Sequence, residues 1–211
     1  MIIYSFNDQL SDDLVEQLSR TIKVDMYKHP PVDGGFPFYT SFNVAKVRHF
    51  PDALEKYYDD KFIKILHHLD LLGRTMVDAF KWCQIYNKST GGKGHPVHTH
   101  FSGNQLLSMV HFIRTPNNQK CFYFIIEGQK YYPDKQNSGD FIVFPSWASH
   151  GVDPVECDDN DRIIVSANFN CNEYKESMDP NNTFTLVCTK ETMWNKQFRK
   201  NMLTKVWSGK P

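Results

Sequence analysis

The chain has 211 residues, enough for one domain of ordinary size, and its 24 basic and 24 acidic side chains leave no formal net charge. No long run of Lys or Arg is present, which excludes the electrostatic pattern of a nucleic-acid-binding protein. Apolar residues make up 40% of the chain and aromatic residues 14%, which is typical of a folded protein rather than a disordered one.

The five cysteines are odd in number and widely spaced, and no two of them have zinc-knuckle spacing. They are expected to be free thiols in a reducing compartment. Residues 1–8 lack the basic and apolar segments of a signal peptide, and no stretch approaches the length of a membrane span. These features predict a soluble protein in the cytoplasm of the producing cell or of a host cell, without a membrane partner.

The first 80 residues are expected to supply helices that flank the main body, after a β-like segment at residues 2–6. One helix is predicted to begin after Ser11, which can cap it, with acidic residues in the first turn. A second helix, in one piece or two, is predicted over residues 51–73 from an apolar stripe: Phe62, Ile65, Leu66, Leu69 and Leu72. His67 and His68 lie beside this stripe and are expected to be surface residues rather than metal ligands.

From residue 81 onward, short apolar and aromatic runs alternate with turns rich in Gly, Pro, Asn and Asp. The expected strands are Trp82–Tyr86, Leu106–Ile113, Cys121–Ile126, Phe141–Phe144, Arg162–Phe169 and Thr183–Val187. Helices followed by many short strands predict an α+β protein built on an antiparallel barrel or sandwich. A single domain is expected over residues 1–170, with its β-barrel core in residues 81–170.

Residues 171–211 are predicted to be a C-terminal extension. Apolar residues recur there near helical spacing and predict a C-terminal helix: Met193, Trp194, Phe198, Met202 and Val206. The apolar face of this helix either packs on the core or meets a partner. Packing on the core is expected, because that is the usual role of an amphipathic stripe.

Three of the nine histidines lie between Gly94 and His100. Residues two apart in a strand point to the same face, so His98 and His100 can both enter one cavity. His150, which follows the predicted strand Phe141–Phe144 and a Pro-Ser-Trp turn, is the best third ligand. Three protein ligands leave positions open on a metal ion, as catalysis requires. The alternative is that these are solvated loop histidines, but the β-rich context and the distant His150 favour a metal site.

Several segments together resemble a known family: Trp82–Tyr86, His98–His100, Ser108–Ile113, Gly139–Trp147 with His150, and Asp161–Phe169. They look like the 2-oxoglutarate/Fe(II)-dependent oxygenases of the prolyl-hydroxylase-like type, many of which occur in marine bacteria and their phages. The resemblance covers residues 40–170, approximately, and is strongest over the last two segments. It implies a viral or bacterial origin.

The resemblance implies a double-stranded β-helix, a jelly-roll or cupin-like barrel, with the metal at its open end. Fe(II) would be held by His98, His100 and His150, 2-oxoglutarate would chelate the iron, and O2 would take the last position, with no catalytic residue beyond the metal ligands. Arg162 lies twelve residues after His150, where similar enzymes place the Arg that binds the distal carboxylate of 2-oxoglutarate. Ser166 and Tyr86 are expected to help hold that carboxylate.

The chain departs from the family pattern in two places. The usual metal motif is His-x-Asp or His-x-Glu, whereas His100 stands here in place of the carboxylate and makes the ligand set less anionic. Two alternatives stay open, namely a role for His100 outside the ligand set and a ligand role for His95. Phe112 stands where family members often carry a tyrosine, and His111 beside it is expected to face the other side of the sheet.

A cupin shares this barrel, and its motifs are met in part by His98, His100 and His150, with Gln105 where a Glu is usual. It would imply a metal-dependent isomerase, or a dioxygenase that does not use 2-oxoglutarate. Arg162 separates the two interpretations, because a cupin has no need of it. A non-enzymatic metal-binding β-module is the third interpretation.

The main interpretation is therefore an Fe(II)/2-oxoglutarate-dependent dioxygenase that hydroxylates a substrate which the sequence does not identify. The resemblance favours a prolyl residue or an amino acid. The expected partner is a small-molecule or peptide substrate and not a nucleic acid, and a homodimer is left open.

Overall fold

The computed structural model describes residues 1–28, 39–42, 50–72, 75–88, 94–100, 105–156, 160–174, 183–188 and 205–208. Its main feature is a large sheet with the strand order β1-β8-β5-β10-β3-β11-β12, in which β2 also pairs with β3. The strands of this sheet are β1 (Tyr4–Asn7), β2 (Tyr39–Thr40), β3 (Thr75–Tyr86), β5 (Gln105–Arg114), β8 (Asp140–Pro145), β10 (Arg162–Tyr174), β11 (Thr183–Cys188) and β12 (Lys205–Ser208).

A smaller antiparallel sheet faces one side of the large sheet. Its order is β4-β9-β6-β7, and its strands are β4 (His95–His98), β9 (His150–Val152), β6 (Phe122–Ile126) and β7 (Gln129–Tyr131). Glu127 and Gly128 join β6 to β7 with φ values of 51° and 76°. Positive φ at both residues is the geometry of a two-residue hairpin turn, which Gly adopts without steric cost. A short 3-10 helix, η2 (Pro116–Asn118), follows β5.

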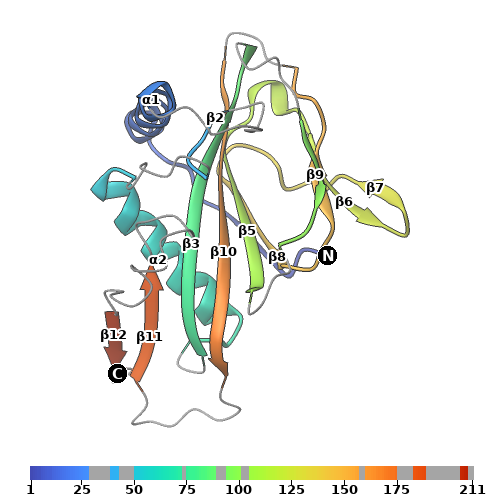
Figure 1. Cartoon of the computed structure of the whole chain (residues 1–211). Coiled ribbons are helices and arrows are strands. Elements are labelled where there is room, and N and C mark those ends of the chain that lie inside the picture. Colours follow the sequence, from blue (N-terminus) through green and yellow to red (C-terminus); the bar gives the residue numbers. More distant parts are fainter. Residues whose placement is uncertain are drawn as a thin grey trace.

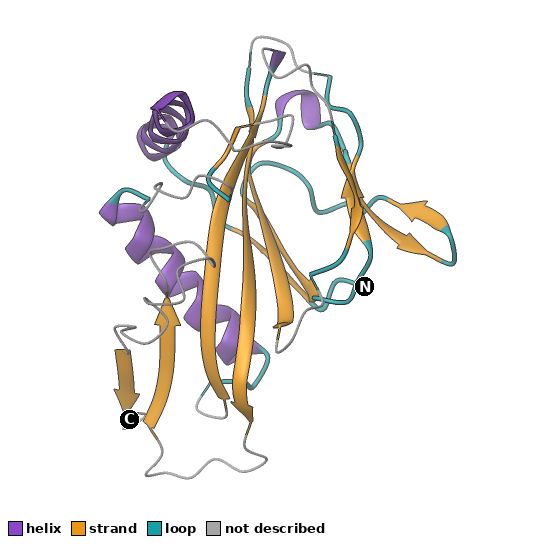
Figure 2. Cartoon of the chain, in the orientation of Figure 1, coloured by secondary structure: helices purple, strands orange, loops and turns teal. Residues whose placement is uncertain are grey.

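Helices α1 (Asp12–Lys28) and α2 (Asp52–His68) cover the opposite face of the large sheet. Figure 1 shows both helices on one side of the long strands β3 and β10, with β6, β7 and β9 on the other. Figure 2 shows the same separation by secondary structure, with the two long helices on one side and only short helical turns elsewhere. The second predicted helix therefore forms as one piece and ends at His68. His67 and His68 are exposed, as expected.

Alternation along β10 explains why the large sheet is buried on both faces. Ile163 and Val165 join the core under the helices, whereas Ile164 joins the core between the two sheets. Successive side chains of a strand point to opposite faces, so the polar residues that lie two or four positions from Ile164 along β10 also point into the barrel. These residues are Arg162, Ser166 and Asn168, and each is buried.

The core under the helices also contains an ion pair. Nζ of Lys81 on β3 and Oε2 of Glu55 on α2 are 2.5 Å apart, and the two side chains are 3% and 8% exposed. Glu55 in addition accepts a hydrogen bond of 3.1 Å from the backbone N–H of Phe50. Neither charge reaches solvent, so each depends on the other for its stability in the folded chain.

The C-terminal part differs from its prediction. Val206, the last residue of the predicted helical stripe, lies in β12, where it is the register partner of Thr185 in β11. Strand β11 runs parallel to β3 and extends the large sheet. Met193, Trp194, Phe198 and Met202 lie outside the described residues. The division at residue 170 stays a prediction.

Candidate metal centre

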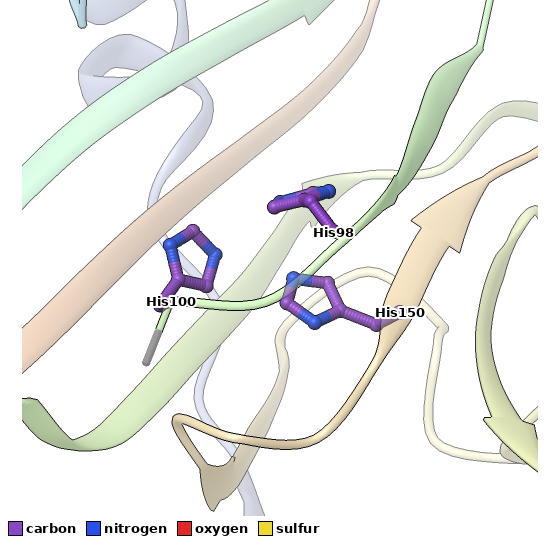
Figure 3. Close-up of side chains that lie close together, drawn as sticks. All are labelled: His98, His100 and His150. Carbon is purple, nitrogen blue, oxygen red and sulfur yellow. The ribbon is translucent and has the colours of Figure 1, made fainter. Parts of the chain in front are cut away.

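Three histidines converge at one end of the barrel, between the two sheets. His98 at the end of β4 is the register partner of His150 at the start of β9, which places their side chains together. His100 follows two residues after β4, and its backbone N–H donates to the carbonyl of Ser146 at 2.9 Å. One ring nitrogen from each histidine lies within 4.8 Å of the others, so a single ion can contact all three. Figure 3 shows the three rings turned toward one another.

Backbone carbonyls select the tautomer of two of these histidines. His98 Nδ1 lies 2.8 Å from the carbonyl of Pro96, and His150 Nδ1 lies 2.8 Å from that of Ala148. A carbonyl can only accept, so each neutral ring carries its proton on Nδ1 and keeps a lone pair on Nε2. Histidines that bind metals in proteins are commonly oriented in this way.

Burial keeps all three rings neutral at physiological pH. Together with the charges of neighbouring histidines, it lowers the pKa of His100 to about 2 and that of His150 to about 3. Burial also lowers the pKa of His98. A neutral imidazole is the form that binds a metal ion, so the metal-free site needs no proton release before binding.

A cavity of about 240 Å³ extends from the histidines into the barrel. It is lined by side chains from both sheets, including Tyr86, Ser108, Ile164, Ser166 and Asn168. In the described part of the chain, no carboxylate lines this cavity. The ligand set that the structure offers is therefore three neutral histidines, and His100 occupies the place where the sequence motif usually has an acidic residue.

Arg162 is the most unusual residue of the barrel interior. The residue is 1% exposed, and its guanidinium carbon lies 5.3 Å from the ring centre of Tyr86 and 5.7 Å from that of Phe112. Among the described residues, Nε, Nη1 and Nη2 have no hydrogen-bond partner. An isolated charge in a protein interior costs several kcal/mol, so an anion at that place would stabilise this group.

Tyr86 lies beside Arg162 in the barrel, and Ser166 lies on the same face of β10. Tyr86, on β3, is the register partner of Arg162 and is fully buried, which raises the pKa of the phenol, so the hydroxyl stays protonated and can donate. Ser166 lies farther along β10, with its Oγ 3.5 Å from Gln84 Oε1. The structure thus brings Tyr86 and Ser166 into the same cavity wall.

His111 faces away from this cavity, as the sequence predicts. Its Nδ1 lies 2.9 Å from the hydroxyl of Tyr58 on α2, and its ring stacks on Phe141 with centres 3.7 Å apart. His95 lines the cavity, and its ring centre is 4.2 Å from that of His98. It lies outside the group of three nitrogen ligands.

An aromatic wall beside His100 is not evident from the sequence. Trp82 lies with its ring centre 5.8 Å from that of His100, and it contacts Phe42 and Phe80 at 5.1 and 5.4 Å. Phe80 and Trp82 lie an even number of residues from Tyr86 on β3, so the period of two could have identified them as inward-facing residues. Phe42 carries no such signal, because it lies outside the long strands. Trp147 is 58% exposed and does not line the cavity.

No protein-family model and no curated protein matches the sequence. Solved structures do match. A prolyl-4-hydroxylase from Pseudomonas putida aligns with a TM-score of 0.56 and 17% identity, over 79% of this chain and 91% of that chain. The alpha-ketoglutarate-dependent epimerase SnoN of nogalamycin biosynthesis aligns with a TM-score of 0.56 and 14% identity, over 85% and 78%. A prolyl hydroxylase from Trichoplax adhaerens, in complex with a peptide fragment of the hypoxia inducible factor oxygen degradation domain, aligns with a TM-score of 0.53 and 13% identity, over 79% and 82%.

These likenesses show the fold of the chain. It is the double-stranded β-helix of the 2-oxoglutarate/Fe(II)-dependent oxygenases, with helices on one face of the large sheet, which confirms the predicted α+β class. The described helices include none that is long and apolar enough to cross a membrane.

Proposed function

We propose that the protein is an Fe(II)- and 2-oxoglutarate-dependent oxygenase that hydroxylates a small-molecule or peptide substrate. The observation that carries this proposal is Arg162, a buried guanidinium without a partner among the described residues. It lies in the same barrel as three histidines that can hold one metal ion. A dicarboxylate that chelates the metal at one end and meets the arginine at the other satisfies both sites.

The residues of the barrel interior fit both groups. His98, His100 and His150 would hold Fe(II), since imidazole suits this metal and three ligands leave positions open. Arg162 would bind the distal carboxylate of 2-oxoglutarate with two parallel hydrogen bonds, because its planar fork matches a carboxylate. The hydroxyls of Tyr86 and Ser166 would donate to the same carboxylate, both being buried in the wall of this cavity.

When bound, iron and 2-oxoglutarate supply the oxidation: 2-oxoglutarate and O2 give succinate and CO2, and one oxygen atom enters a C–H bond of the substrate. The contribution of this chain is to orient and shield. Phe122, Phe144 and Ile164 form an apolar lining that keeps water from the reacting centre. Trp82 and Phe42 line the cavity next to His100 and offer an apolar face to a substrate.

The substrate is proposed at the level of its class. A prolyl residue or an amino acid is favoured by the resemblance in sequence, and both prolyl hydroxylases described above share the fold, one of them bound to a peptide. Two other proteins with this fold are named for different reactions: SnoN is an epimerase and SnoK is a carbocyclase. Hydroxylation is therefore the first reaction to test.

The test begins without O2. Fe(II) and 2-oxoglutarate are added to the protein, and we expect a weak visible charge-transfer band that is absent with Fe(II) alone. His98→Ala should abolish the band by removing a metal ligand. Admission of O2 should then produce succinate. Metal binding that is indifferent to 2-oxoglutarate, with no succinate formed, would refute the proposal and favour a cupin-type enzyme.

The substrate is sought separately, because 2-oxoglutarate is often consumed slowly without one. Protein and metabolite pools are incubated with the active protein and with His98→Ala, and products heavier by one oxygen atom are identified by mass spectrometry. A product that appears only with the active protein identifies the substrate. Succinate without any oxygenated product would point to a reaction other than hydroxylation.

A further inference from the structure

Two buried polar side chains lie behind His100. Ser108 on β5 and Asn168 on β10 are register partners, and each is 1% exposed. Ser108 Oγ and Asn168 Oδ1 are 2.9 Å apart, and Asn168 Nδ2 lies 3.3 Å from His100 Nδ1. His100 therefore differs from His98 and His150, whose Nδ1 atoms meet backbone carbonyls.

A side-chain amide leaves a choice that a carbonyl does not. Rotation of the Asn168 amide by half a turn exchanges its oxygen and nitrogen without moving any other atom. With the nitrogen toward His100, the amide donates to Nδ1 and the ring proton must lie on Nε2. With the oxygen toward His100, the amide accepts from Nδ1–H, and Nε2 keeps its lone pair.

Ser108 is compatible with either arrangement, because a hydroxyl both donates and accepts. His98 and His150, in contrast, are compatible with only one of the two arrangements. The other two histidines present Nε2 lone pairs, so a proton on Nε2 of His100 would occupy the centre of the group and prevent that nitrogen from binding a cation. Only the arrangement with the amide oxygen toward His100 completes a set of three nitrogen donors.

We propose that Asn168 is a positioning residue for the metal centre, whose amide oxygen accepts the Nδ1 proton of His100 while Ser108 holds the amide in place. The proposal explains how His100 can serve as a ligand in place of a carboxylate. A carboxylate offers lone pairs in any state above its pKa, whereas an imidazole must have the correct tautomer. The inference rests on the proposed function only in taking Fe(II) as the ion.

The tautomer is measured directly on the metal-free protein, by ¹⁵N NMR of the histidine ring nitrogens. We expect His98, His100 and His150 all to carry the proton on Nδ1. In Asn168→Leu, which removes both hydrogen-bonding atoms, His100 should shift to the Nε2–H tautomer while the other two stay unchanged. Asn170→Leu, the same substitution two residues along β10, is the matched control and should change none of them.

Metal affinity gives a second measurement. Loss of such a supporting group typically weakens metal binding by about 10- to 100-fold, and we expect this for Fe(II) or Zn(II) with Asn168→Leu. Asn168→Asp supplies an oxygen toward His100 as well and should retain the Nδ1–H tautomer and the affinity. A proton on Nε2 of His100 in the unaltered protein would overturn the proposal, even if Asn168→Leu fails to fold.

The two proposals fail separately. If His100 has the expected tautomer and Asn168→Leu weakens metal binding, but the protein forms no succinate from 2-oxoglutarate, the positioning role stands and the oxygenase function does not. If 2-oxoglutarate is consumed while Asn168→Leu leaves the tautomer and the affinity unchanged, the positioning role is refuted.

Discussion

Replacement of Arg162 by Met should change the protein in two opposite ways. Met fills much of the same volume without charge, so the variant no longer buries an unpaired guanidinium. Replacing a buried charge by a well-packed apolar group is often neutral or stabilising. The metal-free variant should therefore melt at the same temperature as the unaltered protein, or higher.

The response to 2-oxoglutarate should shrink to a third or less in the same variant. Removing one member of a buried charge pair costs about 2–5 kcal/mol of binding free energy, which corresponds to about 30- to 4,000-fold weaker binding. With Fe(II) and without O2, 2-oxoglutarate at a hundred times its Kd stabilises the folded state by about 2.7 kcal/mol. For a chain of this length, that raises the melting temperature by about 5–10 °C. At the same concentration the variant should keep about a third of this rise if binding is about 30-fold weaker, and almost none if binding is about 4,000-fold weaker.

Thermal melting with and without 2-oxoglutarate measures both effects, and Fe(II) affinity should stay unchanged. Arg114→Met is the matched control. Arg114 lies on the adjacent strand β5, is 30% exposed and pairs with Glu16 at the surface, where an ion pair contributes little. A normal rise in the Arg162→Met variant would show that 2-oxoglutarate binds elsewhere. Strong destabilisation of the metal-free variant would show that the guanidinium is already satisfied.

His98→Ala should abolish metal binding in calorimetric titration, whereas His95→Ala should keep the affinity within a few-fold; equal losses would place His95 among the ligands. Glu55→Leu leaves Lys81 buried without its partner and should lower the free energy of unfolding by about 3–5 kcal/mol in denaturant titrations. Adding Lys81→Met should restore most of that loss, and failure to do so would show that packing rather than charge is responsible. Burial lowers the pKa of His111 to about 3 from 6.5, so below pH 6.5 the unfolded chain binds a proton that the folded chain refuses. Stability should therefore fall from pH 6.5 toward pH 3, and His111→Phe should reduce that slope in urea unfolding at several pH values; an unchanged slope would show that His111 is not responsible.

Local pattern was sufficient to predict the central strands of the large sheet and the faces of β10. It missed the short strands β4, β7 and β9, and the boundary at residue 81 was wrong because β3 begins at Thr75. Arg162 and Ile163 are neighbours in sequence, yet one lies between the sheets and the other under the helices. The period of two along a strand dictates this outcome before any tertiary contact forms. The same rule singled out His98 and His100 as a pair. His100 lies beyond the end of β4, so the rule does not apply to it as expected, but the structure brings both to His150.

The same local reasoning failed at the C-terminus. Apolar spacing near 3.6 residues predicted a helix through Val206, but Val206 pairs with Thr185 in a two-stranded extension of the sheet. A periodic pattern over a short segment is a weak preference, and hydrogen bonding to a neighbouring strand can override it. Nothing in the local sequence indicates that such a neighbour is available.

What the sequence by itself determined is the kind of side chain on each face of each strand, because that depends only on backbone period and residue type. The tertiary structure decided which faces meet. Asn168 of β10 reaches His100 in the segment after β4, and Tyr86 contacts Arg162 from a strand far away in the chain. These contacts depend on register between distant strands, which is set by the packing of the whole barrel and is encoded in no single segment.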